Sequence, residues 1–368
     1  MDTMAEKFAA KLHELAAKYG ADFEQTAVAV SGGADSLALA FLLKEFHRKY
    51  GGRAVVLTVN HHLRPEADAE AAMVAELTAQ WGLEHHVLDW FPDDVRSGVE
   101  EKARAARYRL LENWCAENGF HYLLTAHHMQ DQAETFLMRL QRGSGVDGLS
   151  AMAEMTPRGR ITLVRPLLET DPLALRQLLK EKGIVWAEDA LNDCDDFLRV
   201  RIRKFLPELE AKTGIGMKRL AETAHVLRLT REYLDAETNT FIDRHVRCFD
   251  GLAVSLSPAA FCRLHPEIGR RVLARLIKEI GERDYPPEYR ELQRLNGNLQ
   301  NPAFAGCTLG GCEILPFMKR WWIVREGGRQ QKTARKEWDD FVCRNPRYRQ
   351  AVIPYPLKCL LTEKGING

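Results

Sequence analysis

Six residues, Ser31-Gly32-Gly33-Ala34-Asp35-Ser36, separate two apolar runs near the start of the chain. The first run is β-branched and the second has helical spacing, so the pattern predicts a strand that turns directly into a helix. Glycine permits positive φ, and backbone N–H groups at a helix N-terminus converge on an anion such as phosphate. Ser31 and Ser36 could add hydroxyl donors, while Asp35 could cap the helix or bind a Mg²⁺ ion that bridges phosphates. A capped turn without ligand is the alternative for the glycines alone.

All six positions match the pattern SGGxDS, which resembles the loop of the ATP-pyrophosphatase group and lacks the GK[ST] of a Walker loop. The Walker lysine serves transfer of the terminal phosphoryl group. A loop that instead holds the β,γ-pyrophosphate as leaving group transfers AMP. We therefore expect adenylation, with ATP bound by Ser31, Gly32, Gly33, Ala34, Asp35 and Ser36, and with Mg²⁺ at Asp35.

Further residues that could do chemistry follow in four stretches of the sequence. They are His61 and Arg64 after the second strand, Arg104 and Arg107 on one helical face, His127 and His128 before Asp131 and Glu134, and the basic run Arg199, Arg201 and Arg203. Asp131 and Glu134 are three residues apart and therefore share a helix face. Solvated helix faces and a packed strand end are the alternatives for these residues. A His–Asp–Glu metal cluster is a further alternative, although no cysteine or third histidine joins it.

In this order and at these spacings, the stretches over residues 24–210 closely resemble the tRNA(Ile)-lysidine synthetase family. The resemblance implies a two-step reaction on a tRNA(Ile) with a CAU anticodon. The wobble cytidine first attacks ATP and releases pyrophosphate, and the amine of free lysine then displaces AMP. The product, lysidine, changes the tRNA from methionine to isoleucine decoding.

The resemblance also implies roles for single residues. Asp35, Arg107, Asp131 and Glu134 are the catalytic candidates: the arginine, with Arg104, screens phosphate charge, and the two helix carboxylates receive the lysine ammonium and free its amine. The candidates for binding substrate or tRNA are His61, Arg64, Arg104, His127, His128, Arg142, Arg199, Arg201 and Arg203. Three positions depart from the family pattern, namely Asn60, Gln130 and Val200.

Two other kinds of protein could carry the same loop. One is another PP-loop enzyme, such as a tRNA thiolase or an amidotransferase-type synthetase, but the sequence has no cysteine pair near the loop and no room before it for an amidohydrolase domain. The other is a nucleotide- and tRNA-binding protein that has lost catalysis, for which Gln130 and Val200 would be signs. The intact loop and the carboxylates of Asp131 and Glu134 argue against it.

These residues need a scaffold, and the alternation of strands with helices predicts one. Apolar strands are expected at 26–31, 53–60, 84–90, 121–126 and 161–167, with helices at 36–50, 66–81 and 130–141 between them. Such alternation is typical of a parallel α/β sheet covered on both faces, whose ligands bind at the carboxyl ends of the strands. We expect a Rossmann-like ATP-pyrophosphatase domain over 1–210, a helical tRNA-contacting domain over 211–298, and a small mixed α/β tail over 299–368.

Composition bounds the class of protein. Residues 1–190 carry a formal charge of −7 and residues 191–368 one of +8, which favours a polyanionic partner for the second half. The eight cysteines are scattered, and the start of the chain does not resemble a signal peptide, so we expect a cytoplasmic protein without a membrane partner. Trp321 and Trp322 lie in a predicted strand, where at most one of them could stack on a nucleotide. The sequence leaves the oligomeric state open.

Overall fold

The computed structural model describes residues 3–63, 66–91, 99–188, 198–249 and 253–326. The chain forms two compact units, Met1–Thr230 and Arg231–Gly368. The helix α9, Met217–His245, begins in the first unit and ends in the second. The domain boundaries at 210 and 298 expected from the sequence stay predictions. Within the described ranges, no helix is long and apolar enough to cross a membrane.

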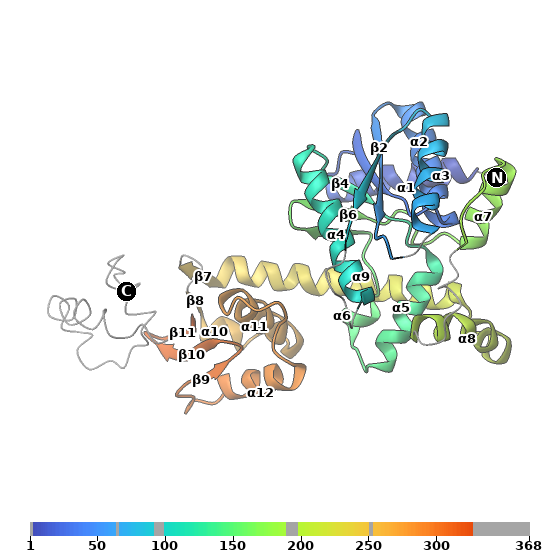
Figure 1. The fold of residues 1–368 in the computed structure, drawn as a ribbon. Coiled ribbons are helices and arrows are strands. Elements are labelled where there is room, and N and C mark those ends of the chain that lie inside the picture. The colour runs from blue at the N-terminus through green and yellow to red at the C-terminus, as the bar shows by residue number, and fades with distance from the viewer. Residues whose placement is uncertain (1–2, 64–65, 92–98, 189–197, 250–252, 327–368) are drawn as a thin grey trace. The chain divides into compact units, whose positions relative to one another are not determined.

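The first unit is a six-stranded sheet with helices on both faces (Figure 1). Its strand order is β3-β2-β1-β4-β6-β5, and only β5 runs antiparallel to its neighbour. The strands are β1 (Gln25–Ala29), β2 (Arg53–Asn60), β3 (Glu84–Asp89), β4 (Tyr122–Leu124), β5 (Met155–Arg158) and β6 (Ile161–Val164). The predicted α/β class and the five predicted strands are confirmed. The short edge strand β5 was not predicted from the sequence.

Most helices of this unit pack on one of the two faces of the sheet, and the others form a small core of their own. They are α1 (Met4–Tyr19), α2 (Ala34–Tyr50), α3 (Glu66–Gln80), α4 (Val99–Glu117), α5 (Met129–Gln141), α6 (Val146–Leu149), α7 (Pro172–Glu181) and α8 (Leu198–Thr213). Val28 of β1 packs in the core formed with α1, α2 and α7, whereas its neighbour Ala27 packs in the core with α4. Successive strand residues point to opposite faces, so one strand supplies both cores.

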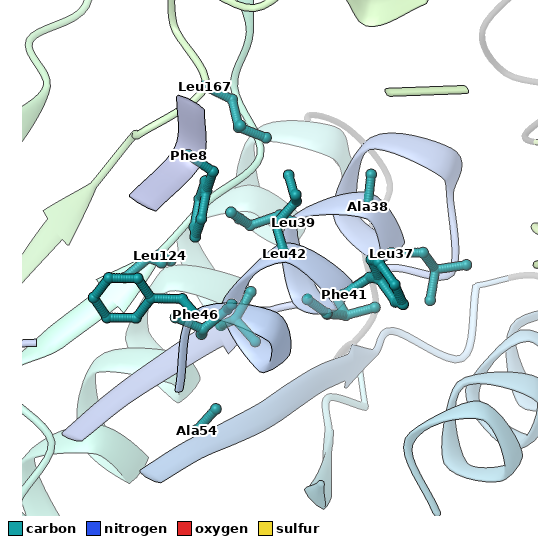
Figure 2. Close-up of a cluster of buried hydrophobic side chains, with 14 of the residues drawn as sticks. Phe8, Leu37, Ala38, Leu39, Phe41, Leu42, Phe46, Ala54, Leu124 and Leu167 are labelled. Carbon is teal, nitrogen blue, oxygen red and sulfur yellow. The ribbon is translucent and has the colours of Figure 1, made fainter. Parts of the chain in front are cut away.

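Helix α2 is the most buried helix of the unit, which explains why its sequence is apolar on nearly every side. Its Leu37, Leu39 and Leu42 are fully buried, with Phe8 of α1 and Leu167 close by (Figure 2). Each leucine contributes ~2 kcal/mol from apolar burial. This packing fixes the start of α2, and therefore the turn of residues 31–36 before it.

The second unit contains a five-stranded antiparallel sheet of order β7-β8-β11-β10-β9, with α10 (Pro258–Phe261), α11 (Pro266–Ile280) and α12 (Tyr289–Leu299). The strands are β7 (Val246–Phe249), β8 (Ala253–Leu256), β9 (Cys307–Leu309), β10 (Cys312–Phe317) and β11 (Arg320–Arg325). The Gly-rich hairpins after residue 304 agree with the sequence pattern, but β7 and β8 interrupt a region expected to be helical.

Both tryptophans of β11 are buried, so neither serves as an exposed stacking platform. Trp321 is 7% exposed and packs edge-on against Phe261, with ring centroids 5.4 Å apart. Trp322, 5% exposed on the other face, stacks on Phe249 and donates its indole N–H to the Phe317 carbonyl at 3.1 Å. Neither tryptophan is free, because Phe261 packs on Trp321, while Phe249 and Phe317 of other strands of the same sheet pack on Trp322.

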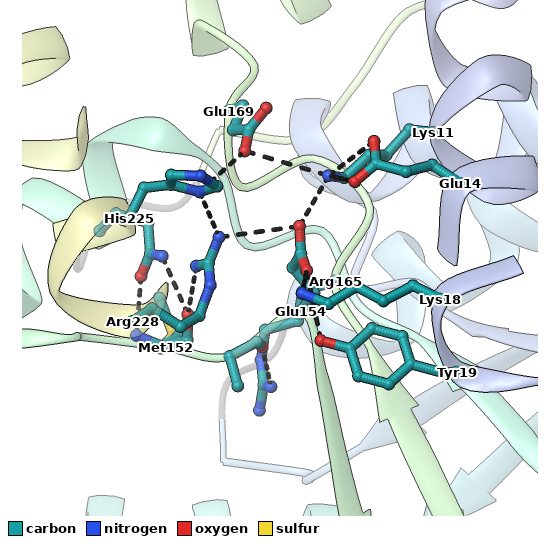
Figure 3. Close-up of polar contacts among 12 residues, drawn as sticks. Lys11, Glu14, Lys18, Tyr19, Met152, Glu154, Arg165, Glu169, His225 and Arg228 are labelled. Carbon is teal, nitrogen blue, oxygen red and sulfur yellow. Dashed lines mark hydrogen bonds and ion pairs between the residues drawn. The ribbon is translucent and has the colours of Figure 1, made fainter. Parts of the chain in front are cut away.

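A buried carboxylate, Glu154, joins the N-terminal helix to the first half of α9 (Figure 3). Its side chain is 3% exposed, and its oxygens lie 2.6 Å from Lys11 Nζ, 3.3 Å from Lys18 Nζ and 3.7 Å from Arg228 Nη2. Arg228 is itself 2% exposed. Burial alone would raise the pKa of Glu154, but Lys11, Arg228 and Lys18 outweigh it and lower the pKa to about 2.

We predict that Glu154→Gln lowers the free energy of unfolding at neutral pH by about 3 kcal/mol, because it leaves buried cations without their carboxylate. The folded pKa lies below the ordinary value of 4.5, so this stabilisation is present above that pH and is lost as the pH falls toward 2. Urea unfolding at neutral pH and down to about pH 3 measures both effects.

Glu14→Gln is the matched control, since Glu14 is the exposed partner of the same Lys11 at 3.0 Å. An exposed pair contributes about 0–1 kcal/mol, so this variant should unfold like the parent protein. Equal stability of the Glu154 variant and the parent at neutral pH would contradict the assignment.

Candidate functional site

The turn of residues 31–36 follows β1 and has the form of an anion cradle. Gly32 has φ +86°, in the region that favours glycine, and Gly33 is the N-cap of α2. The hydroxyl of Ser36 accepts from the Ser31 backbone N–H at 3.1 Å and donates to the Gly33 carbonyl at 2.9 Å. Ser36 therefore braces the turn, and the backbone N–H groups at the start of α2 are the donors left for a phosphate.

Asp35 lies in the first turn of α2, and one of its oxygens is buried without a partner among the described residues. That atom is Oδ1, while Oδ2 lies 3.3 Å from His128 Nε2. The other ring nitrogen of His128 lies 3.5 Å from Asp131 Oδ2. The imidazole thus connects the turn after β1 to helix α5, two segments that are far apart in the sequence.

The pKa values of the two adjacent histidines after β4 are shifted in opposite directions. Burial lowers the pKa of His128, but its hydrogen bond to Asp35 and the charge of Asp131 outweigh burial and raise the pKa above 6.5. Burial lowers the pKa of His127 to about 4, and its Nδ1 lies 3.1 Å from the Thr125 hydroxyl. Near neutral pH His127 is neutral, whereas His128 is the more readily protonated of the two histidines.

Asp131 lines the same cleft and also caps its own helix. Its Oδ2 accepts from the His128 backbone N–H at 2.9 Å. Burial would raise the pKa of Asp131, but His128, His127 and Arg199 outweigh it and hold the pKa below the ordinary value. Asp131 is therefore an ionised carboxylate at the wall of the cleft.

Glu134, one turn further along α5, is fully buried between two arginines of α8. Its oxygens lie 3.0 Å from Arg199 Nε and 2.8 Å from Arg203 Nε, and Gln130 donates to it at 3.0 Å. Burial would lower the pKa of Arg203, but Glu134 raises it overall. The roles expected from the sequence, tRNA binding by these arginines and lysine binding by this glutamate, stay predictions. In the structure the three side chains pair with one another, while Arg201 is exposed.

The departures from the family pattern have structural roles here. Asn60 is buried, donates to Asp68 Oδ1 at 2.6 Å and accepts from the His62 backbone N–H at 3.0 Å. Val200 is buried in α8. Gln130 bonds Glu134 as described above. Each of the three polar or apolar replacements therefore fits its position in the fold.

The remaining candidates line one open cleft in the first unit. His61, Arg104, Arg107 and Arg142 are on its wall, and Arg142 is the C-cap of α5. Burial and the nearby Arg107 lower the pKa of His61. Arg64 lies outside the described residues. The described part of the chain contains no group of three or more His, Cys, Asp or Glu that could hold a metal ion, so the His–Asp–Glu metal cluster is not found there.

The cleft is larger than a nucleotide requires. Its volume is about 2720 Å³, whereas small-molecule sites typically have about 300–1,000 Å³. Lys7 and Lys11 of α1 and Arg176 of α7 also line it. These three basic residues were not among the site residues predicted from the sequence. The spacing of Lys7 and Lys11, at i and i+4 on one helix face, is the signal that could have indicated them. The size and the added cations suit a large anionic substrate beside the nucleotide.

We predict that Asp35→Asn lowers the pKa of His128 to below about 6.5, because burial then acts without its hydrogen-bonded anion. An NMR titration of the histidine ring signals measures this pKa. Asp68→Asn, which removes a carboxylate 3.4 Å from His62 instead, is the control and should leave His128 unchanged. An unchanged His128 pKa in the Asp35 variant would show that the two side chains do not interact.

Comparison with known proteins identifies the family. The model of the PP-loop domain matches residues 4–209. A tRNA(Ile)-lysidine synthase from Ruegeria pomeroyi is 40% identical over 299 residues, 81% of this chain and 70% of the relative. One from Bradyrhizobium sp. strain BTAi1 is 38% identical over 301 residues, 79% of this chain and 83% of the relative.

A solved structure shares the fold of the chain. It is the U34-tRNA thiolase NcsA from Methanococcus maripaludis with its [4Fe-4S] cluster, with a TM-score of 0.50, 15% identity, and coverage of 61% of this chain and 79% of the thiolase. At this identity the likeness concerns the fold alone. The much closer sequence relatives, together with the PP-loop domain, show that the chain belongs to the tRNA(Ile)-lysidine synthase family.

Proposed function

We propose that this chain forms lysidine at the wobble cytidine of a CAU-anticodon tRNA(Ile), as a ligase that makes a carbon–nitrogen bond. The cytidine carbonyl oxygen attacks the α-phosphate of ATP, which releases pyrophosphate and leaves an adenylated base. The amine of free lysine then attacks the carbonyl carbon of this cytidine, whose oxygen now carries the AMP group, and displaces AMP. The observation that carries the proposal is the Asp35–His128–Asp131 connection, which joins the turn of residues 31–36 to the carboxylate-bearing helix α5 at one cleft.

In the first step, the turn holds the pyrophosphate portion of ATP. The backbone N–H groups after Gly33 and the dipole of α2 stabilise the charge that develops on the leaving group. We assign Mg²⁺ to Asp35, because its buried Oδ1 has no partner among the described residues and Mg²⁺ is commonly held by one or two carboxylates together with phosphates and water. The ion would neutralise phosphate charge. Arg107 and Arg104 line the same cleft and would add positive charge for the phosphates of ATP.

In the second step, the lysine substrate brings an ammonium group to carboxylates. Asp131 is ionised and lines the cleft, so it is the group that first receives the ammonium. We infer that Arg199 and Arg203 turn to backbone phosphates when tRNA binds, which frees Glu134 for the lysine amine. Their guanidinium groups are about one third exposed and can reach an RNA backbone from α8. Arg201 and Arg142, both exposed, contribute further phosphate contacts. We expect the reaction in the cytoplasm.

The direct test incubates the protein with CAU-anticodon tRNA(Ile) transcript, ATP, Mg²⁺ and labelled lysine. We predict incorporation of lysine, and pyrophosphate exchange that depends on tRNA. Asp35→Ala should abolish both, whereas Asp22→Ala, an exposed aspartate outside the cleft, should abolish neither. Exchange without lysine incorporation would leave another PP-loop tRNA-modifying enzyme. Loss of both in the parent protein would leave a protein that only binds nucleotide and tRNA.

We predict that Glu134→Gln keeps pyrophosphate exchange within about twofold of the parent protein but slows lysine transfer by about 10²-fold, because only the second step needs the carboxylate. The two assays measure the two steps separately. Glu154→Gln removes a different buried, arginine-paired carboxylate, which pairs with Lys11 and Arg228 and not with the arginines of α8, and it controls for lost stability. Equal losses in both steps of the Glu134 variant would refute its assignment to lysine.

A further inference from the structure

Tyr108 is a buried aromatic residue of α4 that is surrounded by arginines. It is 6% exposed. The guanidinium carbons of Arg104 and Arg107 each lie 5.4 Å from the centre of its ring, and that of Arg158 lies 4.7 Å away. Guanidinium groups within about 6 Å of an aromatic ring are attracted by its quadrupole. One ring thus holds three cations in place.

These arginines differ in how their charge is compensated. Arg158 lies 3.6 Å from the carboxylate of Glu112. Arg104 and Arg107 have no carboxylate partner in the described part of the chain. Burial lowers the pKa of the Arg107 guanidinium, the Tyr108 side chain partly offsets this, and the charge of Arg104 lowers it further. Arg107 is half-buried, whereas Arg104 is exposed. Two adjacent cations without a carboxylate partner, one of them partly desolvated, are stabilised by an anion that binds from the cleft.

Another arginine, Arg165, is buried and interacts electrostatically with Tyr108 and Arg104. Arg165, 9% exposed, donates to the Ala153 carbonyl at 2.8 Å and to the Thr156 hydroxyl at 2.9 Å, both neutral acceptors. Burial lowers its pKa, the Tyr108 hydroxyl raises it, and Arg104 lowers it. Arg165 does not line the cleft, whereas Arg104, Arg107 and Tyr108 do. Arg104 and Arg107 are therefore the two of these three arginines that a substrate in the cleft can reach.

We propose that Tyr108 is a positioning residue for an oxyanion site. Its ring holds Arg104 and Arg107 at the wall of the cleft, where the two guanidinium groups take a phosphate group of a substrate. The phosphate belongs either to ATP or to the tRNA backbone at the wobble nucleotide. The inference rests on the proposed function, and it adds a positioning residue, Tyr108, that the motif matches do not assign.

The test compares Tyr108→Leu and Tyr108→Phe with the parent protein in lysidine formation and in tRNA-dependent pyrophosphate exchange. ATP, tRNA and lysine are titrated separately. Tyr108→Leu should raise the KM of ATP or of tRNA about tenfold and leave the KM of lysine unchanged, because the arginines lose their support. The KM that rises identifies the source of the phosphate. Tyr108→Phe keeps the ring and should restore most of the affinity.

A double-mutant cycle with Arg107→Ala shows whether Tyr108 acts through the arginine. The Leu substitution should have little further effect in the Arg107→Ala background, since the group that it positions is gone. Tyr122→Leu is the matched control: this half-buried tyrosine packs edge-on against Phe23 of the same unit, 5.1 Å away, without arginines, and its loss should leave every KM unchanged.

Three results would overturn the inference. One is unchanged KM values for ATP and tRNA in Tyr108→Leu, and another is full additivity with Arg107→Ala. A rise in the KM of lysine alone would also refute it, since the arginines would then bind the carboxylate of free lysine and not a phosphate. If the parent protein exchanges pyrophosphate but incorporates no lysine, the proposed function fails, yet the ATP and tRNA titrations in the exchange assay still decide the role of Tyr108.

Discussion

The imidazole of His128 is the interaction on which the site depends. It lies between Asp35, at the start of α2, and Asp131, in the first turn of α5. These helices follow β1 and β4, which are neighbours in the sheet although their first residues, Gln25 and Tyr122, are 97 positions apart in the sequence. Two carboxylates this close would repel each other without a cation between them. The raised pKa of His128 shows that it favours the charged form that this place requires.

The same physical solution recurs at the two buried glutamates. Glu134 is neutralised by Arg199 and Arg203 of α8, and Glu154 by Lys11 of α1 and Arg228 of α9. A buried carboxylate is tolerated only when it is paired, so each one requires a later helix to dock at a defined place. Apolar contacts support the first docking, because Phe136 and Leu206 share a small core between α5 and α8.

The two pairings differ in what they leave available to a substrate. The cations around Glu154 include Arg228, which is almost fully buried, so this cluster is a structural joint. The arginines of Glu134 are about one third exposed and stand beside the cleft. Under the proposed function, this exposure lets an RNA backbone compete with the glutamate for its arginines. The arginines Arg104 and Arg107 beside Tyr108 are the reverse case, since they lack a carboxylate partner in the described ranges.

The sequence by itself determined the parts of this protein that depend on local pattern. The SGGADS turn, its place between a strand and a helix, and the α/β class follow from residue type and period, because side-chain spacing and glycine conformations act over a few residues. Its order of motifs also pointed to the family. Only the tertiary structure decided which groups meet: that Arg199 and Arg203 hold Glu134, that Trp321 and Trp322 are both covered, and that Tyr108 gathers arginines from α4 and from Arg158 at the end of β5. Charge pairing and burial join residues that are distant in the chain, and no local pattern encodes such partners.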